Sequence, residues 1–241
     1  MKIQGSIALV TGANRGIGRS LVEALLEAGA AKVYAGARKL ADLEPVRALD
    51  PARVVPLELD ITDAHEVAAA TAAAGDTTLL INNAGVLGSG SVLASPEEAI
   101  RQDMEVNYFG TLALSRAFAP LLEANGGGAL VNVLSVVSFV SMPGLGGYNA
   151  SKAAAWSLTQ SLRAELSKRQ IAVISVFPGP IDTDMAKDIP LEKTPPSAVA
   201  EEVLAAIEAE REDVFPDPMS KEVYAGWAAD HKAVERQFAA M

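Results

Sequence analysis

Cysteine is absent from this sequence of 241 residues, and there are only two histidines. Without cysteine the protein has no disulfide, no thiol nucleophile and no thiolate metal ligand. His65 and His231 lie far apart in polar or helical stretches, so we expect no metal site. No apolar run reaches the ~18 residues of a membrane-spanning helix, and residues 1–6 show no secretory signal. We therefore expect a soluble, cytoplasmic protein with no membrane partner.

Positive charge is also scarce. The chain has 20 Lys and Arg against 30 Asp and Glu, which gives a formal net charge of −10. An acidic protein is poorly suited to non-specific binding of nucleic acid or anionic membranes, so no nucleic-acid partner is expected. Any phosphate group must be met by local cations or backbone amides. Half of the residues are hydrophobic, which is enough for a large folded core.

Short apolar runs alternate with stretches of helical periodicity along the whole chain. This alternation predicts an α/β fold with a doubly wound parallel sheet of the Rossmann type. No change in composition marks a second domain, so we interpret residues 1–241 as a single dinucleotide-binding and catalytic domain. Pro56 favours an edge position for its strand, because proline cannot donate a ladder hydrogen bond. The expected strands are residues 7–10, 33–35, 54–59, 79–81, 129–135, 172–177 and 214–215. The expected helices include one that stops at Gly29, then residues 64–74, 95–123, 148 onward, 197–211 and 220–241, with a loop over 138–147.

A glycine-rich turn follows the first expected strand. Gly12, Gly16 and Gly18 lie between that strand and a helix, and a second strand comes next. Such a turn brings backbone N–H groups and a helix N-terminus to phosphate oxygens. An ordinary glycine-rich turn is the alternative, but the flanking strands favour dinucleotide binding. The expected cofactor contacts in this turn are Gly12, Asn14, Arg15, Gly16, Ile17 and Gly18.

The end of the second strand bears on the choice of cofactor. An NAD site commonly places an acid about 20 residues beyond the glycines, to bind the ribose hydroxyls. This chain has Arg38 there, and Arg15 lies in the glycine turn. Two guanidinium groups suit a ribose 2′-phosphate, so we favour NADP (NADPH) over NAD. The alternative is that both arginines are solvated surface charges.

Tyr148 and Lys152 lie four residues apart at the start of an expected helix, and therefore on one helix face. A phenol ordinarily ionises near pH ~10, and a neighbouring ammonium lowers that pKa. The pair is therefore a candidate general acid and base. A packed tyrosine beside a solvated lysine is the alternative interpretation of the same spacing.

Taken together, these motifs resemble the short-chain dehydrogenase/reductase family over nearly the whole chain. Ser135 lies 13 positions before Tyr148, which is similar to the family spacing. The chain departs from the family after its last strand, where residues 213–218 replace the usual glycine-rich segment. The family forms homodimers or homotetramers, and this departure bears on the tetramer contacts. The matching pieces are the glycine turn, Asp60, Asn82-Asn83-Ala84-Gly85, Asn107, Ser135, Tyr148, Lys152 and Pro178-Gly179.

The resemblance implies an oxidoreductase that passes a hydride between NADP(H) and a carbonyl or alcohol carbon. It assigns Tyr148 as general acid and base, with Lys152 lowering its pKa and holding a nicotinamide ribose hydroxyl. It assigns Ser135 to the carbonyl oxygen and Asn107 to a water that links Lys152 to solvent. Asn107 could instead be a buried amide that kinks its helix.

The resemblance also implies cofactor contacts beyond the glycine turn. Asp60 matches the residue that contacts the adenine amine, although it could instead cap the next helix. Asn83 and Gly85 belong near the adenosine ribose. Ile181 and Thr183 match positions at the nicotinamide carboxamide, and Thr183 could alternatively cap a short helix.

Apolar residues follow the cofactor-binding strand ends and are candidates for the substrate pocket. They favour an apolar ketone or aldehyde, or the corresponding secondary alcohol. Three other functions stay open: an NAD-linked alcohol dehydrogenase, a non-catalytic NADP(H)-sensing protein, and a methyltransferase on a similar sheet. The candidate pocket residues are Val86, Leu87, Val137, Phe139, Met142, Leu145, Met185 and Ile189.

Overall fold

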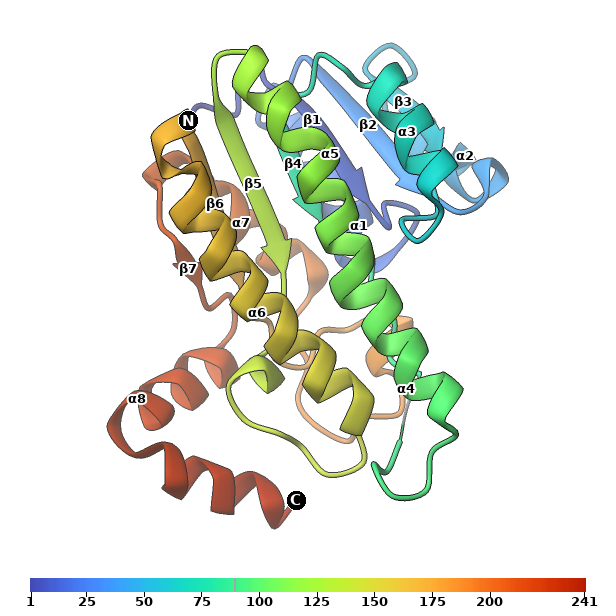
Figure 1. Ribbon diagram of the computed structural model, residues 1–241. Helices are drawn as coiled ribbons and strands as arrows, with labels where there is room; N and C mark the ends of the chain where they lie inside the picture. Colours follow the sequence, from blue (N-terminus) through green and yellow to red (C-terminus); the bar gives the residue numbers. More distant parts are fainter. Residues whose placement is uncertain (89) are drawn as a thin grey trace.

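The protein contains one seven-stranded sheet in the order β3-β2-β1-β4-β5-β6-β7, and every strand pairing is parallel. The computed structural model describes residues 1–88 and 90–241. Figure 1 shows the strands running in one direction, so that their carboxyl ends meet at one edge. The strands are β1 Ile7–Thr11, β2 Lys32–Ala37, β3 Val54–Glu58, β4 Leu79–Asn82, β5 Gly128–Val133, β6 Ile171–Val176 and β7 Asp213–Val214.

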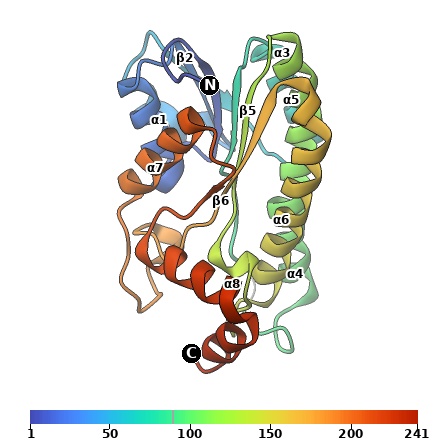
Figure 2. The same ribbon diagram turned by 90° about the vertical axis from the view of Figure 1, so that its left-hand side faces the viewer.

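Helices cover both faces of the sheet, which confirms the doubly wound α/β fold. Figure 2 shows α1 and α7 on one face, and α3, α5 and α6 on the other. The last helix, α8, lies beyond the carboxyl ends of the strands. The helices are α1 Gly16–Glu27, α2 Glu44–Arg47, α3 Ala64–Ala73, α4 Glu97–Met104, α5 Thr111–Ala124, α6 Gly146–Leu166, α7 Pro196–Ala209 and α8 Pro218–Ala239.

The apolar runs of the sequence become strands that are buried on both faces. Successive side chains of a strand point to opposite faces of the sheet. In β1, Ala8 and Val10 join the core beneath α1 and α7, whereas Leu9 joins the core beneath α3, α5 and α6. A continuous apolar strand is therefore needed to fill both layers.

The sheet edge expected at Pro56 is observed. β3 is the outermost strand, and Pro56 stands opposite Ala35 of β2. Gly29 follows α1 with φ +82, a conformation that suits glycine at a helix end. The predicted strands all occur, with ends shifted by a residue or two.

The long helical region predicted over residues 95–123 is confirmed, and its middle part is π-helical. It divides into α4, a π-helical segment Glu105–Gly110 and α5. The extra residue of a π turn shifts the faces of the two flanking helices relative to each other. Asn107, expected in this region, lies within the π-helical segment. Among the described residues, no helix is both long and apolar enough to cross a bilayer.

Phe118 of α5 allows a test of how the sheet is held to its helices. Its side chain is fully buried in the core that contains Leu9 and Leu80. We expect Phe118→Ala to lower the free energy of unfolding by about 3–5 kcal/mol, because the lost ring leaves a cavity. Urea denaturation followed by circular dichroism measures this change.

The matched control is Phe109→Ala, because Phe109 is 48% exposed and contacts the ring of Tyr108 at its edge. The control should change the free energy of unfolding by no more than about 1 kcal/mol. Equal effects of the two substitutions would contradict this account of the core.

Candidate active site

A cavity of about 320 Å³ opens at the carboxyl ends of the strands, where the strand order reverses between β1 and β4. Ligands of such sheets bind at this switch point. The cavity runs from the glycine turn to α6, and the segment 178–191 forms one of its sides. The predicted cofactor residues all line it: Gly12, Asn14, Arg15, Gly16, Ile17, Gly18, Arg38, Asp60, Asn83, Gly85, Tyr148, Lys152, Pro178, Gly179, Ile181 and Thr183.

The glycine turn needs its glycines because of close backbone approaches. A Cβ on Gly18 would lie 2.1 Å from the carbonyl oxygen of Gly12, which is a severe clash. Gly16 has φ +53, and a Cβ there would lie 3.0 Å from the Thr183 methyl group. The turn therefore presents bare backbone at the N-terminus of α1, the arrangement that receives phosphate groups.

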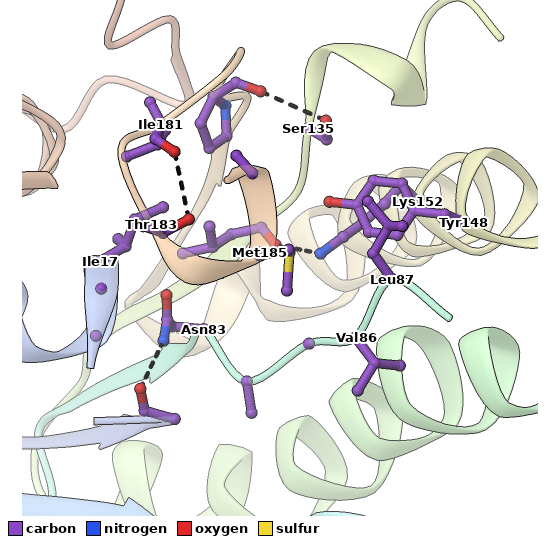
Figure 3. A pocket seen from close by; sticks show the side chains of 18 of the residues that line it. Ile17, Asn83, Val86, Leu87, Ser135, Tyr148, Lys152, Ile181, Thr183 and Met185 are labelled. Atoms are coloured by element: carbon purple, nitrogen blue, oxygen red, sulfur yellow. Dashed lines mark hydrogen bonds between the residues drawn. The ribbon is translucent and has the colours of Figure 1, made fainter. Parts of the chain in front are cut away.

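Asn83 fixes the glycine turn to the end of β4. Its amide nitrogen donates to the carbonyl oxygens of Thr11 at 2.8 Å and Gly12 at 3.3 Å. The Thr11 hydroxyl in turn accepts from the backbone N–H groups of Asn83 and Ala84, each at 3.0 Å. These bonds join β1 and β4 beyond the last rung of their ladder. Asn83 thus shapes the cavity as well as lining it (Figure 3).

The structure excludes the alternative role of Asp60 as the cap of α3. Asp63, and not Asp60, caps α3, since its carboxylate accepts from the N–H groups of His65 and Glu66. The Asp60 carboxylate accepts from the backbone N–H and the hydroxyl of Thr62, and it lines the cavity. The contact of Asp60 with the adenine amine stays a prediction.

The two arginines at this end have different surroundings. Arg15 forms an ion pair of 2.8 Å with Asp184, which joins the glycine turn to the segment after β6. Arg38 also lines the cavity, and no acidic side chain of the described residues pairs with it. Its guanidinium is therefore available to an anion. Thr183 does not cap the short helix Asp184–Ala186 with its side chain, because its hydroxyl donates to the Ile181 carbonyl.

Ser135, Tyr148 and Lys152 meet at the other end of the cavity. Ser135 comes from the end of β5, and the other two come from the first turns of α6. The Ser135 hydroxyl donates to the carbonyl oxygen of Pro178 at 3.4 Å. Lys152 donates from Nζ to the carbonyl oxygen of Val133 at 2.9 Å, and Nζ lies 5.7 Å from the centre of the Tyr148 ring. In Figure 3 the Tyr148 hydroxyl and the Lys152 ammonium both point into the cavity.

The predicted lowering of the Tyr148 pKa by Lys152 is wrong for this structure. Burial raises the pKa of Tyr148 to about 12, and the neighbouring Ser135 hydroxyl offsets only part of that shift. The buried carboxylate of Asp103 raises it further. Burial also lowers the pKa of Lys152 to about 8. Desolvation dominates because both side chains are less than a tenth exposed.

Asn107 is the one predicted catalytic residue that does not line the cavity. Its side-chain oxygen accepts from the N–H of Val86, and its amide nitrogen donates to the Val86 carbonyl and to the Ser151 hydroxyl, all at 2.9 Å. The residue is buried within the π-helical segment. Asn107 therefore ties the chain after β4 to α6, as expected of a buried amide in a distorted helix. Its assignment to a bound water stays a prediction.

Most of the predicted pocket residues line the cavity, but Phe139 does not. Its ring packs among Trp156, Phe177, Tyr224 and Trp227, with ring centres 4.5–5.4 Å away. The short helix Val136–Ser138, unexpected within the predicted loop, turns Phe139 into this aromatic cluster. The residues that do line the cavity are Val86, Leu87, Val137, Met142, Leu145, Met185 and Ile189.

Comparison with known proteins agrees with this geometry. A family model described as short chain dehydrogenase matches residues 6–194, more than three quarters of the chain. The chain belongs to the short-chain dehydrogenase family. The fungal short chain dehydrogenase mpl6 of Monascus purpureus is 34% identical over 202 residues, which cover 78% of this chain and 69% of that protein.

Solved structures resemble this short-chain dehydrogenase over almost its full length. A short chain dehydrogenase from Burkholderia cenocepacia, in complex with NADP, is 48% identical with a TM-score of 0.94, and 99% of each chain is covered. A short chain dehydrogenase/reductase from Burkholderia phymatum, in complex with NAD, is 26% identical with a TM-score of 0.85. That comparison covers 98% of this chain and 96% of the other.

Sequence reasoning missed two cavity residues from the C-terminal helix, Met219 and Phe238. The pocket residues were predicted because they follow the ends of strands. Met219 and Phe238 follow no strand end, so this reasoning could not find them. It also missed Gln102 of α4, whose polar side chain lines the cavity. In the described part of the chain, no three His, Asp or Glu side chains are grouped to hold a metal ion.

The buried ammonium of Lys152 generates a prediction about stability. The Lys152 pKa falls from 10.5 in the unfolded chain to about 8 in the fold, so the folded protein binds fewer protons between these values. Wild-type stability should therefore rise, relative to Lys152→Met, as the pH increases from 8 to 10.5. The relative gain should be about 3 kcal/mol.

Urea denaturation of both proteins across that pH range measures the difference. Lys168→Met is the matched control, because Lys168 is exposed at the far end of α6. A gap between wild type and Lys152→Met that is constant with pH would contradict the buried-ammonium account.

Proposed function

We propose that this short-chain dehydrogenase transfers a hydride between NADP(H) and the carbonyl carbon of an apolar ketone or aldehyde, or the matching secondary alcohol. One observation carries the proposal. Ser135 and Tyr148 line one cavity with the bare glycine turn. A carbonyl oxygen placed between the two hydroxyls would accept a hydrogen bond from each.

The residues of the cavity suit NADP. Gly18 permits the close packing of the glycine turn, and α1 begins there with its N–H groups available for a diphosphate. Arg38, which has no acidic partner in the described chain, suits the 2′-phosphate. The relative from Burkholderia cenocepacia holds NADP and supports this assignment. Lys152 is placed to bind a ribose hydroxyl near Tyr148.

Bound NADPH supplies the hydride. In the direction of reduction, Ser135 orients the carbonyl oxygen and Tyr148 gives its proton to that oxygen as negative charge develops. In the direction of oxidation, Tyr148 accepts the alcohol proton. The Tyr148 pKa of about 12 keeps the phenol protonated at neutral pH, which is the form required for reduction. Lys152, with a pKa of about 8, is mainly a cation at neutral pH.

The apolar end of the cavity supports an apolar substrate. Leu87, Val137, Met142 and Leu145 surround the side on which Tyr148 lies. Methionine adapts its shape to different ligands because it is unbranched and polarisable. These side chains offer little to balance a charged substrate, so we assign the substrate class to neutral carbonyl compounds.

Tyr148→Phe tests the proton transfer. Ketones and aldehydes are offered with NADPH, and the loss of reduced-nicotinamide absorbance is followed. Wild type should turn over apolar members of the panel, and the variant should lose at least about 100-fold in kcat while its NADPH Kd stays unchanged. Tyr108→Phe is the matched control, because Tyr108 does not line the cavity. Its kcat should match that of wild type.

Full activity of Tyr148→Phe would reject this assignment. Tight NADPH binding by wild type with no turnover of any carbonyl would instead favour the alternative of an NADP(H)-sensing protein.

Arg38→Asp tests the cofactor choice. If Arg38 binds the 2′-phosphate, a carboxylate at that position should raise the KM for NADPH by roughly 10- to 100-fold, because it repels the phosphate. The KM for NADH should stay level or fall. Lys39→Asp is the matched control, since Lys39 is an exposed neighbour that does not line the cavity. An equal preference for NADPH in wild type and Arg38→Asp would reject the assignment of Arg38 to the 2′-phosphate. A preference of wild type for NADH would move the assignment to an NAD-linked enzyme.

A further inference from the structure

The C-terminal helix α8 returns to the cavity at both of its ends. Met219, at its start, and Phe238, near its end, both line the cavity. The two residues can meet there only because the helix is bent at Asp230, where φ is −152 and ψ is 89. Figure 1 shows the two halves of α8 beyond the carboxyl ends of the strands, with the second half turned back.

The bend is a capped helix start within α8. The Asp230 carboxylate accepts from the backbone N–H groups of Lys232 and Ala233, each at 3.0 Å. An aspartate with this bonding begins a new helix, so the second half has its own cap. Gly226 allows the halves to approach, since a Cβ there would lie 3.0 Å from a Val234 methyl group.

The second half of α8 is anchored by apolar contacts beside the reacting groups. Val234 is buried and Phe238 is 1% exposed. Both belong to one hydrophobic cluster that contains Val137 and the ring of Tyr148. The cluster also includes partly buried residues of the cavity wall: Leu87, Met142, Leu145 and Met219. The Phe238 ring is thus enclosed by protein on most sides and faces the cavity with the remainder.

The first half of α8 is tied to the opposite side of the cavity. Asp217 is 2% exposed, and one carboxylate oxygen accepts from the Ser220 N–H in the helix cap. Its other oxygen accepts from the N–H of Gly179 at 2.8 Å. The turn Pro178-Gly179 lines the cavity, so this carboxylate fixes the start of α8 relative to the site. The position of Phe238 therefore depends on the Asp217 hydrogen bonds at the start of α8 and on the apolar contacts of its second half.

We infer that Phe238 is a specificity-determining residue, whose ring limits the size of the apolar substituent that a carbonyl substrate carries into this end of the cavity. The inference rests on the proposed function for the identity of the substrate. Phe238 extends the cavity wall with a residue from the last turn of α8, beyond the residues that follow the strand ends. Ketones with small substituents fit beside the ring, and bulky ones require the space that it fills.

Direct binding measurements test this inference without requiring turnover. A series of ketones from acetone to aryl ketones is titrated into the complex with oxidised NADP, which has no hydride to give, with tryptophan fluorescence as the signal. Trp227 of α8 packs against the same cluster and can report occupancy. Phe238→Ala should bind the bulkiest ketones roughly tenfold more tightly, relative to the smallest ones, than wild type does. Phe238→Trp should shift the ratio in the opposite direction.

Phe238→Leu provides the same test if Phe238→Ala fails to fold, with a smaller shift in the same direction. Phe109→Ala is the control, because its ring lies outside the cavity and is exposed. An unchanged ratio of affinities in folded Phe238 variants that bind NADP would overturn the inference. A size effect on binding without any turnover by wild type would uphold the role of Phe238 while rejecting the proposed reaction.

Discussion

The amide of Asn83 holds together the part of the fold on which the site depends. It donates to the carbonyl groups at the end of β1, while Thr11 accepts from the backbone after β4. These bonds fix two neighbouring strand ends where the strand order reverses, and a parallel sheet leaves its backbone groups unpaired there. The bare glycine turn and the start of α1 take their positions from this junction. The shape of the cavity thus follows from backbone hydrogen bonding at one point of the sheet.

Burial, more than mutual attraction, governs the groups at the other end of the cavity. The fold removes Tyr148 and Lys152 from water, which favours the neutral form of each. Tyr148 keeps its proton, and Lys152 remains a cation only below a pKa of about 8. The carbonyl of Val133 gives the buried ammonium a partner. The site therefore combines a protonated donor with a nearby cation that is costly to bury, which is consistent with the proposed reduction.

Particular residues show where sequence reasoning succeeded and failed. Lys152 was predicted because its four-residue helical phase with Tyr148 is a local feature, whereas Ser135 was assigned through the family resemblance. Phe139 was misplaced because a short helix after Ser135 turns its ring toward an aromatic cluster. Asn107 is a buried amide in a distorted helix, as one of its two interpretations predicted, but its partners Val86 and Ser151 were not predicted. Hydrogen bonds to residues 21 and 44 positions away leave no periodic trace in the sequence.

By itself, the sequence determined the α/β fold, the edge position of the strand with Pro56, the glycine turn and the spacing of the candidate catalytic residues. Each of these follows from local periodicity or from the backbone chemistry of glycine and proline. Only the tertiary structure decided the direction of the Tyr148 pKa shift and the return of α8 to the cavity. Desolvation and packing depend on which distant segments enclose a side chain. That enclosure exists only after the chain has folded.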